Sequence, residues 1–90
     1  MSSEINWRIE VREKIYKDTE KFPQKDRARI LQIFEVISSS PFSGDVEKMK
    51  GEENVWRRRV GAYRIFYEIL PKDRVIYIFR VERRTSKTYR

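Results

Sequence analysis

The sequence predicts an α+β domain with the element order β-α-α-β-β-β, in which a helical hairpin packs on one face of a small, mainly antiparallel sheet. Three observations predict this fold. Apolar and polar residues alternate near both ends of the chain, as in strands with one buried face. Residues 12–39 carry apolar side chains at helical spacing. Residues 55–70 are rich in β-branched and aromatic residues and are divided by Gly61-Ala62, which indicates a hairpin. The ninety residues are expected to form one domain, 1–90.

The first strand is expected over residues 5–11, because apolar residues occupy every second position from Ile5 to Val11. A first helix follows from about Arg12. Pro23 interrupts it and suits the first turn of a second helix over residues 23–39, which Pro41 ends. The apolar face of this second helix is predicted to consist of Ile30, Ile33, Phe34 and Ile37, with Leu31 beside it.

Residues 42–54 are expected to form a loop, and residues 74–81 a last alternating strand after the Pro71-Lys72-Asp73 turn. In that strand Val75, Tyr77, Phe79 and Val81 are predicted to lie on one face, with Ile76, Ile78 and Arg80 on the other.

The hairpin carries the candidate functional residues. Arg57 and Arg59 point to one face of their strand, and Arg64 points to one face of the next. If the two strands pair as a hairpin, the three guanidinium groups can converge on one exposed patch of the sheet. Like charges repel, so stability alone gives no reason to gather them, whereas an anionic partner does. The arginine fork matches phosphate oxygens and stays charged at every working pH. Arg58 falls on the other face with Trp56 and Val60, so it must extend its charged end to solvent or lie at the sheet edge.

The net charge of +7 lies in the second half of the chain. Residues 1–45 carry eight basic and eight acidic residues, whereas residues 46–90 carry thirteen and six. This segregation favours a nucleic acid or an acidic protein as partner. Besides the arginines, the basic candidates for RNA contacts are Lys48, Lys50, Arg83 and Lys87.

Several kinds of chemistry are excluded by composition. The chain has no cysteine and no histidine, so it offers no disulfide, no Cys-His or Ser-His nucleophile, and no zinc site. Its carboxylates are scattered, unlike those of a two-metal nuclease. No cofactor, metal or membrane contact is expected, and a cytoplasmic location fits. Arginine, lysine and tyrosine can still support RNA cleavage by the strand's own 2′-hydroxyl, because fixed cations stabilise the developing phosphorane.

The order of these motifs resembles the RelE/ParE toxin superfamily. The matching pieces are Trp7-Arg8-Ile9-Glu10-Val11, Lys21-Phe22-Pro23, Ser40-Pro41, Lys48-Met49-Lys50-Gly51, residues 56–67, and the ending Arg83-Arg84…Tyr89-Arg90. The resemblance to RelE-type members implies the toxin of a type II toxin-antitoxin system, a ribosome-dependent endoribonuclease (mRNA interferase) that cuts messenger RNA and is neutralised by a cognate antitoxin. It implies catalytic roles for Arg57, Arg59, Arg64, Arg84 and Tyr89.

Three alternatives remain open at this point. A ParE-type chain with the same fold inhibits DNA gyrase without catalysis, and a plain RNA- or ribosome-binding module uses its arginines only for backbone phosphates. The three arginines of the hairpin can also hold an acidic antitoxin segment, since carboxylate satisfies the same fork as phosphate. Tyr89 can simply pack its ring on the sheet.

Overall fold

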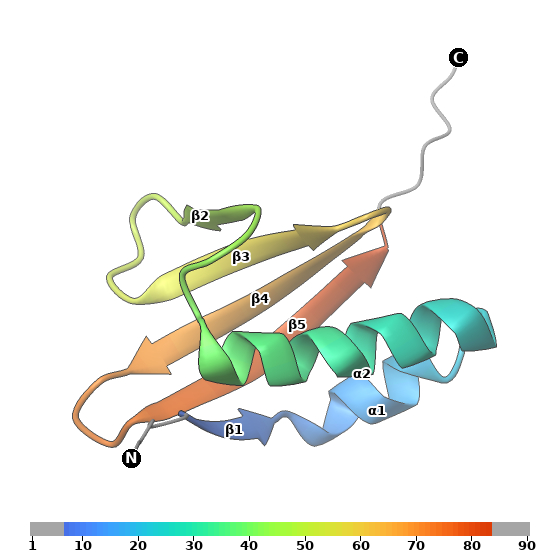
Figure 1. Cartoon of the computed structure of the whole chain (residues 1–90), viewed down its shortest axis with the longest axis horizontal. Coiled ribbons are helices and arrows are strands. Elements are labelled where there is room, and N and C mark those ends of the chain that lie inside the picture. The colour runs from blue at the N-terminus through green and yellow to red at the C-terminus, as the bar shows by residue number, and fades with distance from the viewer. Residues whose placement is uncertain (1–6, 84–90) are drawn as a thin grey trace.

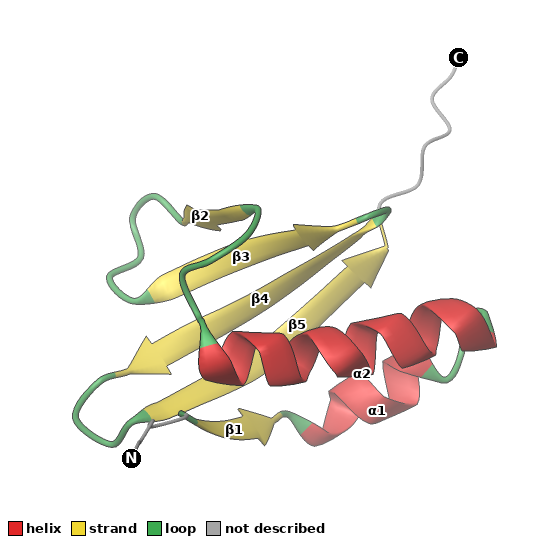
Figure 2. Ribbon diagram, in the orientation of Figure 1, coloured by secondary structure: helices red, strands yellow, loops and turns green. Residues whose placement is uncertain are grey.

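The computed structural model describes residues 7–83, which form two helices and a five-stranded sheet (Figures 1 and 2). The helices are α1 (Glu13–Thr19) and α2 (Gln24–Ser39). The strands are β1 (Arg8–Val11), β2 (Val46–Lys48), β3 (Val55–Val60), β4 (Tyr63–Leu70) and β5 (Val75–Arg83). The predicted α+β fold class is confirmed, with a helical hairpin on one face of the sheet.

The strand order is β1-β5-β4-β3-β2, so the two longest strands lie in the middle of the sheet. The first and last strands, β1 and β5, pair in parallel, and the other three pairings are antiparallel. Both described helices pack on the same face (Figure 1). We call the other face, which these helices leave uncovered, the open face.

The core lies between the helices and the covered face of the sheet. Side chains of α1 and α2 meet alternate residues of the two central strands, as the helical and strand periods predict. The fully or nearly buried core residues are Ile15, Ile30, Phe34 and Ile37 from the helices and Val60, Tyr63, Ile65, Tyr67, Ile69, Ile76, Ile78 and Val81 from the sheet. Leu31 and Ile33 are only partly buried against this cluster.

The strand β2 was not predicted, since residues 42–54 were expected to be a loop. Its three residues pair antiparallel with β3, and two backbone bonds flank the pairing, from Met49 N to Val55 O and from Arg59 N to Asp45 O, both 2.9 Å. Three residues are too few to show an alternating pattern, so only the partner strand reveals them.

The chain before β2 lies close to Arg58. As expected, this arginine reaches toward the sheet edge, where its guanidinium donates to the carbonyl of Ser43 at 2.7 Å. Gly44 adopts φ +88°, and a Cβ there would lie 2.6 Å from the nearest guanidinium nitrogen. Glycine therefore serves both the left-handed backbone and the close approach of Arg58.

The faces of β5 differ from the prediction after Ile78. The register between β4 and β5 shifts at Phe66/Tyr67, so that Tyr67 lies opposite Ile78 and Phe66 opposite Arg80, with Phe79 left over as a bulge. The bulge reverses the alternation. Val81 consequently lies in the core with Ile78, and not on the face of Phe79 as the simple period predicts.

Candidate functional site

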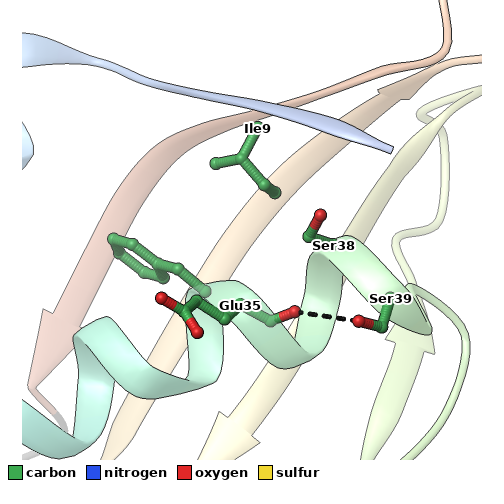
Figure 3. Close-up of a pocket in the computed structure, with 5 residues that line it drawn as sticks. Ile9, Glu35, Ser38 and Ser39 are labelled. Carbon is green, nitrogen blue, oxygen red and sulfur yellow. Dashed lines mark hydrogen bonds between the residues drawn. The ribbon is translucent and has the colours of Figure 1, made fainter. Parts of the chain in front are cut away.

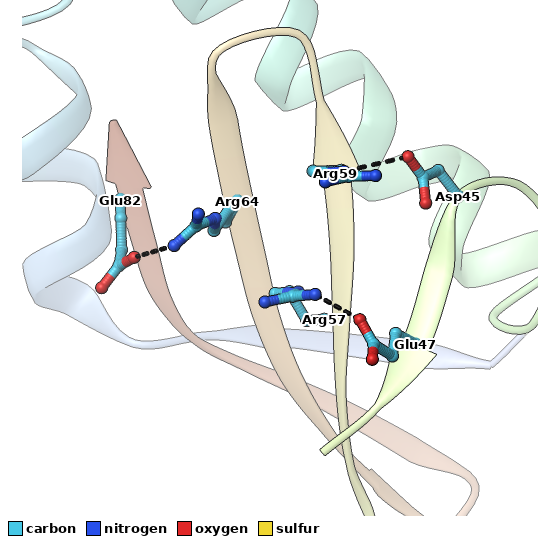
Figure 4. Close-up of polar contacts among 6 residues, drawn as sticks. All are labelled: Asp45, Glu47, Arg57, Arg59, Arg64 and Glu82. Carbon is cyan, nitrogen blue, oxygen red and sulfur yellow. Dashed lines mark hydrogen bonds and ion pairs between the residues drawn. The ribbon is translucent and has the colours of Figure 1, made fainter. Parts of the chain in front are cut away.

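The strand pairing brings the three predicted arginines of the hairpin onto the open face. Residues directly opposite each other in an antiparallel pair point to the same side. Arg59 lies opposite Arg64, and Arg57 lies opposite Phe66, whereas the neighbours Tyr63 and Ile65 point into the core. The expectation that Arg57, Arg59 and Arg64 share one face is therefore confirmed (Figure 4).

Each arginine of this face is paired with a carboxylate from a neighbouring segment (Figure 4). Arg57 donates to Glu47 of β2, and Arg59 Nε donates to Asp45, which precedes that strand, at 3.1 Å. A guanidinium nitrogen of Arg64 lies 3.6 Å from Glu82 of β5. The charges that an anionic ligand would need are thus held in position, and they are not free.

These ion pairs are easily exchanged. The pairs Arg57–Glu47 and Arg59–Asp45 each have a carboxylate partner that is strongly exposed, 67% for Glu47 and 61% for Asp45, so water screens them, and such pairs contribute about 0–1 kcal/mol to stability. The Arg64–Glu82 pair is less exposed, at 29% and 27%, but its separation of 3.6 Å is longer than a hydrogen bond. A phosphate can therefore replace a carboxylate on these guanidinium groups at little cost, and it offers the same bidentate geometry.

Arg64 is the best fixed of the three. It lies in the central strand β4, and its Nε is buried without a hydrogen-bond partner in the structure. We expect Arg64 to contribute the most preorganised donor on the open face.

Arg80 also belongs to the open face, although its pattern predicted the other side. The bulge at Phe79 places it opposite Phe66, and its guanidinium lies 5.4 Å from the centre of the Phe66 ring. It pairs with Glu82, the same carboxylate that Arg64 approaches. The open face therefore carries four guanidinium groups and three carboxylates, arranged as two pairs and one set in which Glu82 serves both Arg64 and Arg80.

The remaining predicted residues do not join the arginine face. Lys48 lies opposite Trp56, on the side that the helices cover, and Lys50 lies in the exposed loop after β2. Arg83 lies opposite Tyr63 at the end of β5, 5.8 Å from the centre of its ring, also on that side. Arg84, Lys87 and Tyr89 lie outside the described residues.

Two tyrosines lie beneath the open face, in the core. Burial raises the pKa of Tyr67 to about 12, with Arg58 acting in the opposite direction, and its hydroxyl donates to the carbonyl of Pro41 at 2.5 Å. Burial, and then a hydrogen bond from its hydroxyl to Asp26 at 2.7 Å, raises the pKa of Tyr63. Neither hydroxyl can exchange protons with a ligand on the open face.

These shifts predict a loss of stability in alkali. A tyrosine whose folded pKa exceeds its unfolded value of about 10 stabilises the fold fully below pH 10, and that contribution is lost as the pH rises from about 10 through 12. Urea unfolding between pH 8 and 12 should follow this course. Tyr67→Phe, which has no ionisable hydroxyl, should lose less stability over the same range, and parallel curves for the two proteins would contradict the assignment.

One pocket lies far from the arginines, between β1 and the C-terminal end of α2 (Figure 3). It is lined by Ile9, Phe34, Glu35, Ser38 and Ser39, and Ser39 donates back to the carbonyl of Glu35 at 3.4 Å. It contains no basic side chain and therefore does not match an anionic ligand. Within residues 7–83, no three acidic side chains gather as metal ligands, and neither helix is long and apolar enough to cross a bilayer.

The guanidinium groups of the open face have the charge and the donors that a phosphate with additional negative charge would need. Guanidinium groups remain protonated, so they are suited to charge stabilisation and poorly suited to proton transfer. Arg84 and Tyr89, for which the family resemblance implies catalytic roles, are in the part of the chain that the structure does not describe.

Comparison with known proteins agrees with this fold. The family model described as "ParE toxin of type II toxin-antitoxin system, parDE" matches residues 9–87. A Methanocaldococcus jannaschii protein named RelE1 is 26% identical over 83 residues, covering 89% of this chain and 92% of the relative.

Two solved structures from archaea are similar over most of their length. The RelE chain of the Pyrococcus horikoshii RelE-RelB complex is 25% identical, with a TM-score of 0.78 over 92% of this chain and 100% of that one. A chain of the Methanococcus jannaschii RelB-RelE antitoxin-toxin complex is 31% identical, with a TM-score of 0.67 over 82% and 88%. The protein therefore belongs to the ParE toxin family of type II toxin-antitoxin systems, within the RelE/ParE superfamily.

Proposed function

We propose that the protein is a ribosome-dependent endoribonuclease that cleaves messenger RNA. The 2′-hydroxyl of the RNA attacks the adjacent phosphorus, so the nucleophile comes from the substrate and no metal is needed. Arg57, Arg59 and Arg64 position the scissile phosphate and stabilise its additional charge. Arg84 and Tyr89 assist the leaving group and orient the nucleotide. The protein then acts in the cytoplasm, where ribosomes are found.

The main support for this proposal is the strand register, which places Arg59 directly opposite Arg64 and beside Arg57 on the open face. These three guanidinium groups lie on one face of the sheet, and each is paired with an exchangeable carboxylate. A fold stabilised by its core gains little from such a cluster, whereas a phosphodiester in its transition state gains several charge-assisted hydrogen bonds.

We propose further that a cognate antitoxin blocks this face with an acidic segment. The two archaeal relatives were solved as complexes of a toxin with its antitoxin. Carboxylates of such a segment would replace Asp45, Glu47 and Glu82 on the arginines without changing the kind of contact.

The test is to add the purified protein to a translating extract and map the messenger by primer extension. We expect new 5′ ends at defined codon positions, which should disappear when the cognate antitoxin is added. Intact messenger at a toxin concentration that arrests growth would contradict the proposal.

The second candidate is inhibition of DNA gyrase, because the matching family model is named for ParE. A gyrase inhibitor should leave the messenger intact and accumulate stalled gyrase–DNA complexes in a supercoiling assay. Its binding surface need not include the open face, so replacing Arg64 should leave that activity unchanged. Primer extension and the supercoiling assay, each performed with the wild type and with Arg64→Ala, therefore distinguish the two functions.

A further inference from the structure

Three aromatic rings lie together on the open face beside the arginines. Phe66 of β4 is opposite Arg80, and Tyr77 of β5 is opposite Glu68. The rings of Phe66 and Phe79 are 6.4 Å apart, and those of Tyr77 and Phe79 are 6.3 Å apart and nearly parallel, at 28°. All three are only partly buried, although the core on the covered face is closed without them.

The bulge at Phe79 builds this arrangement. With regular alternation, Arg80 would point with Ile76 and Ile78 into the core. Because the register shifts by one residue, Phe79 and Arg80 both lie across from Phe66 and both face the open side. Bulges commonly redirect a side chain at a functional position, and here the result is a row of rings that ends at a guanidinium group.

The charges around the rings are unequal. Phe66 has Arg80 of β5 directly opposite it, and Arg64 lies two residues before it on the same face of β4, whereas Tyr77 at the other end has Glu68 and Glu10 as its sheet neighbours. Glu82 pairs with Arg64 and Arg80 at the first end, and Arg8 pairs with Glu10 at 2.9 Å at the second. The first end therefore keeps one excess positive charge and the second one excess negative charge, so a phosphate is favoured at the first end. The rings between these two ends suit an uncharged, flat group that is attached to the phosphate. A nucleobase is such a group.

We propose that Phe66, Tyr77 and Phe79 form a stacking platform for a base of single-stranded RNA whose phosphate is held by Arg64 and Arg80. This inference rests on the proposed function, since it takes the RNA from it. Aromatic side chains on an uncovered sheet face stack unpaired bases in other RNA-binding folds, and arginines beside them track the backbone. The platform places a nucleotide next to the scissile phosphate and contributes binding that does not depend on base identity.

The experiment measures the binding of the full-length protein to two uncleavable 2′-O-methyl oligonucleotides by fluorescence anisotropy. One carries all its bases, and the other is abasic at three central positions. The wild type should bind the complete strand more tightly. Phe79→Leu keeps an apolar side chain on the open face but removes the ring, and it should weaken binding of the complete strand by about 5- to 150-fold, the range for losing one stacked base. Binding of the abasic strand should not change.

One control accompanies this variant. Tyr16→Leu removes an aromatic residue of α1 that is 47% exposed and lies off the open face, and it should have no effect. Circular dichroism and the denaturant midpoint establish that Phe79→Leu is folded. If it is not, Tyr77→Leu gives the same test at the end of the row.

The outcomes separate this inference from the function on which it rests. Equal affinity of the wild type for the complete and the abasic strand overturns the platform, whatever primer extension gives. Base-dependent binding that Phe79→Leu leaves intact also overturns it. If Phe79→Leu weakens only the complex with the antitoxin, the rings are a protein-docking surface and the platform is again wrong. If the wild type leaves the messenger intact but still binds the complete strand more tightly than the abasic one, and Phe79→Leu removes that difference, only the proposed catalysis is contradicted.

Discussion

Replacing Arg64 by alanine is expected to lower the rate of messenger cleavage about 100- to 1,000-fold, which corresponds to about 2.7–4 kcal/mol of transition-state stabilisation. Arg64 lies in a central strand, directly opposite Arg59, and its side chain is 29% exposed. It is therefore held before the substrate arrives. Removing a fixed donor costs most where charge develops, so the single-turnover rate on saturated ribosomes should fall while affinity changes much less.

The control for charge is Lys72→Ala, in the exposed turn between β4 and β5, which removes one positive charge away from the open face. It should change cleavage little and should mainly slow association. Arg64→Lys keeps the charge but loses the planar fork, so its rate should lie between those of the wild type and Arg64→Ala. If Arg64→Ala and Lys72→Ala weaken binding equally and single-turnover cleavage stays intact, the arginine is a binding contact and not a catalytic one.

The open face could be predicted because the hairpin has a simple period. Gly61-Ala62 fixes the turn, and the alternation from there decides which residues share a face. Buried residues such as Ile65 alternate with Arg64 and Phe66 without interruption, so the register follows from the pattern. The same argument correctly separated Arg58 from Arg57 and Arg59.

The bulge in β5 could not be predicted in this way. Residues 75–79 are apolar on both faces, so the period carries no information about which side faces the helices. The inward position of Val81 and the outward position of Arg80 depend on pairing with β4 across the shift. Tertiary contacts decide this choice, since the alternative would bury a guanidinium group.

The carboxylates that hold the arginines were also missed. Asp45 and Glu47 meet Arg59 and Arg57 only because the short strand β2 pairs with β3. In the sequence these two residues lie in a segment with glycine and charged residues that predicts a loop. The sequence therefore predicts a cluster of free arginines, whereas the folded chain has an arginine network with exchangeable partners.

Replacing Tyr67 by alanine is expected to destabilise the protein by about 3–5 kcal/mol, the range for removing a large aromatic side chain from a core. Tyr67 is fully buried, on the side of β4 opposite to Arg64 and Phe66, and its hydroxyl satisfies the carbonyl of Pro41 before β2. Small domains are stable by about 5–15 kcal/mol, so this loss removes a large part of the total. Tyr67→Phe should lose about 1–3 kcal/mol, because the Pro41 carbonyl is left without its donor.

Denaturant unfolding of the three proteins measures these differences, and the slope with denaturant should stay unchanged if the same surface is exposed. The two Tyr67 variants also show whether Tyr67 only stabilises the fold beneath the arginines or takes part in the cleavage reaction. Under conditions in which Tyr67→Phe is folded, its cleavage rate per folded molecule should equal that of the wild type, because its ring still fills the core beneath the arginines. Arg64→Ala should show the reverse, with a free energy of unfolding within about 0.5 kcal/mol of the wild type and a large loss of cleavage. A Tyr67→Phe protein that is folded but inactive would place the hydroxyl in the reaction, which its burial on the covered face of the sheet argues against.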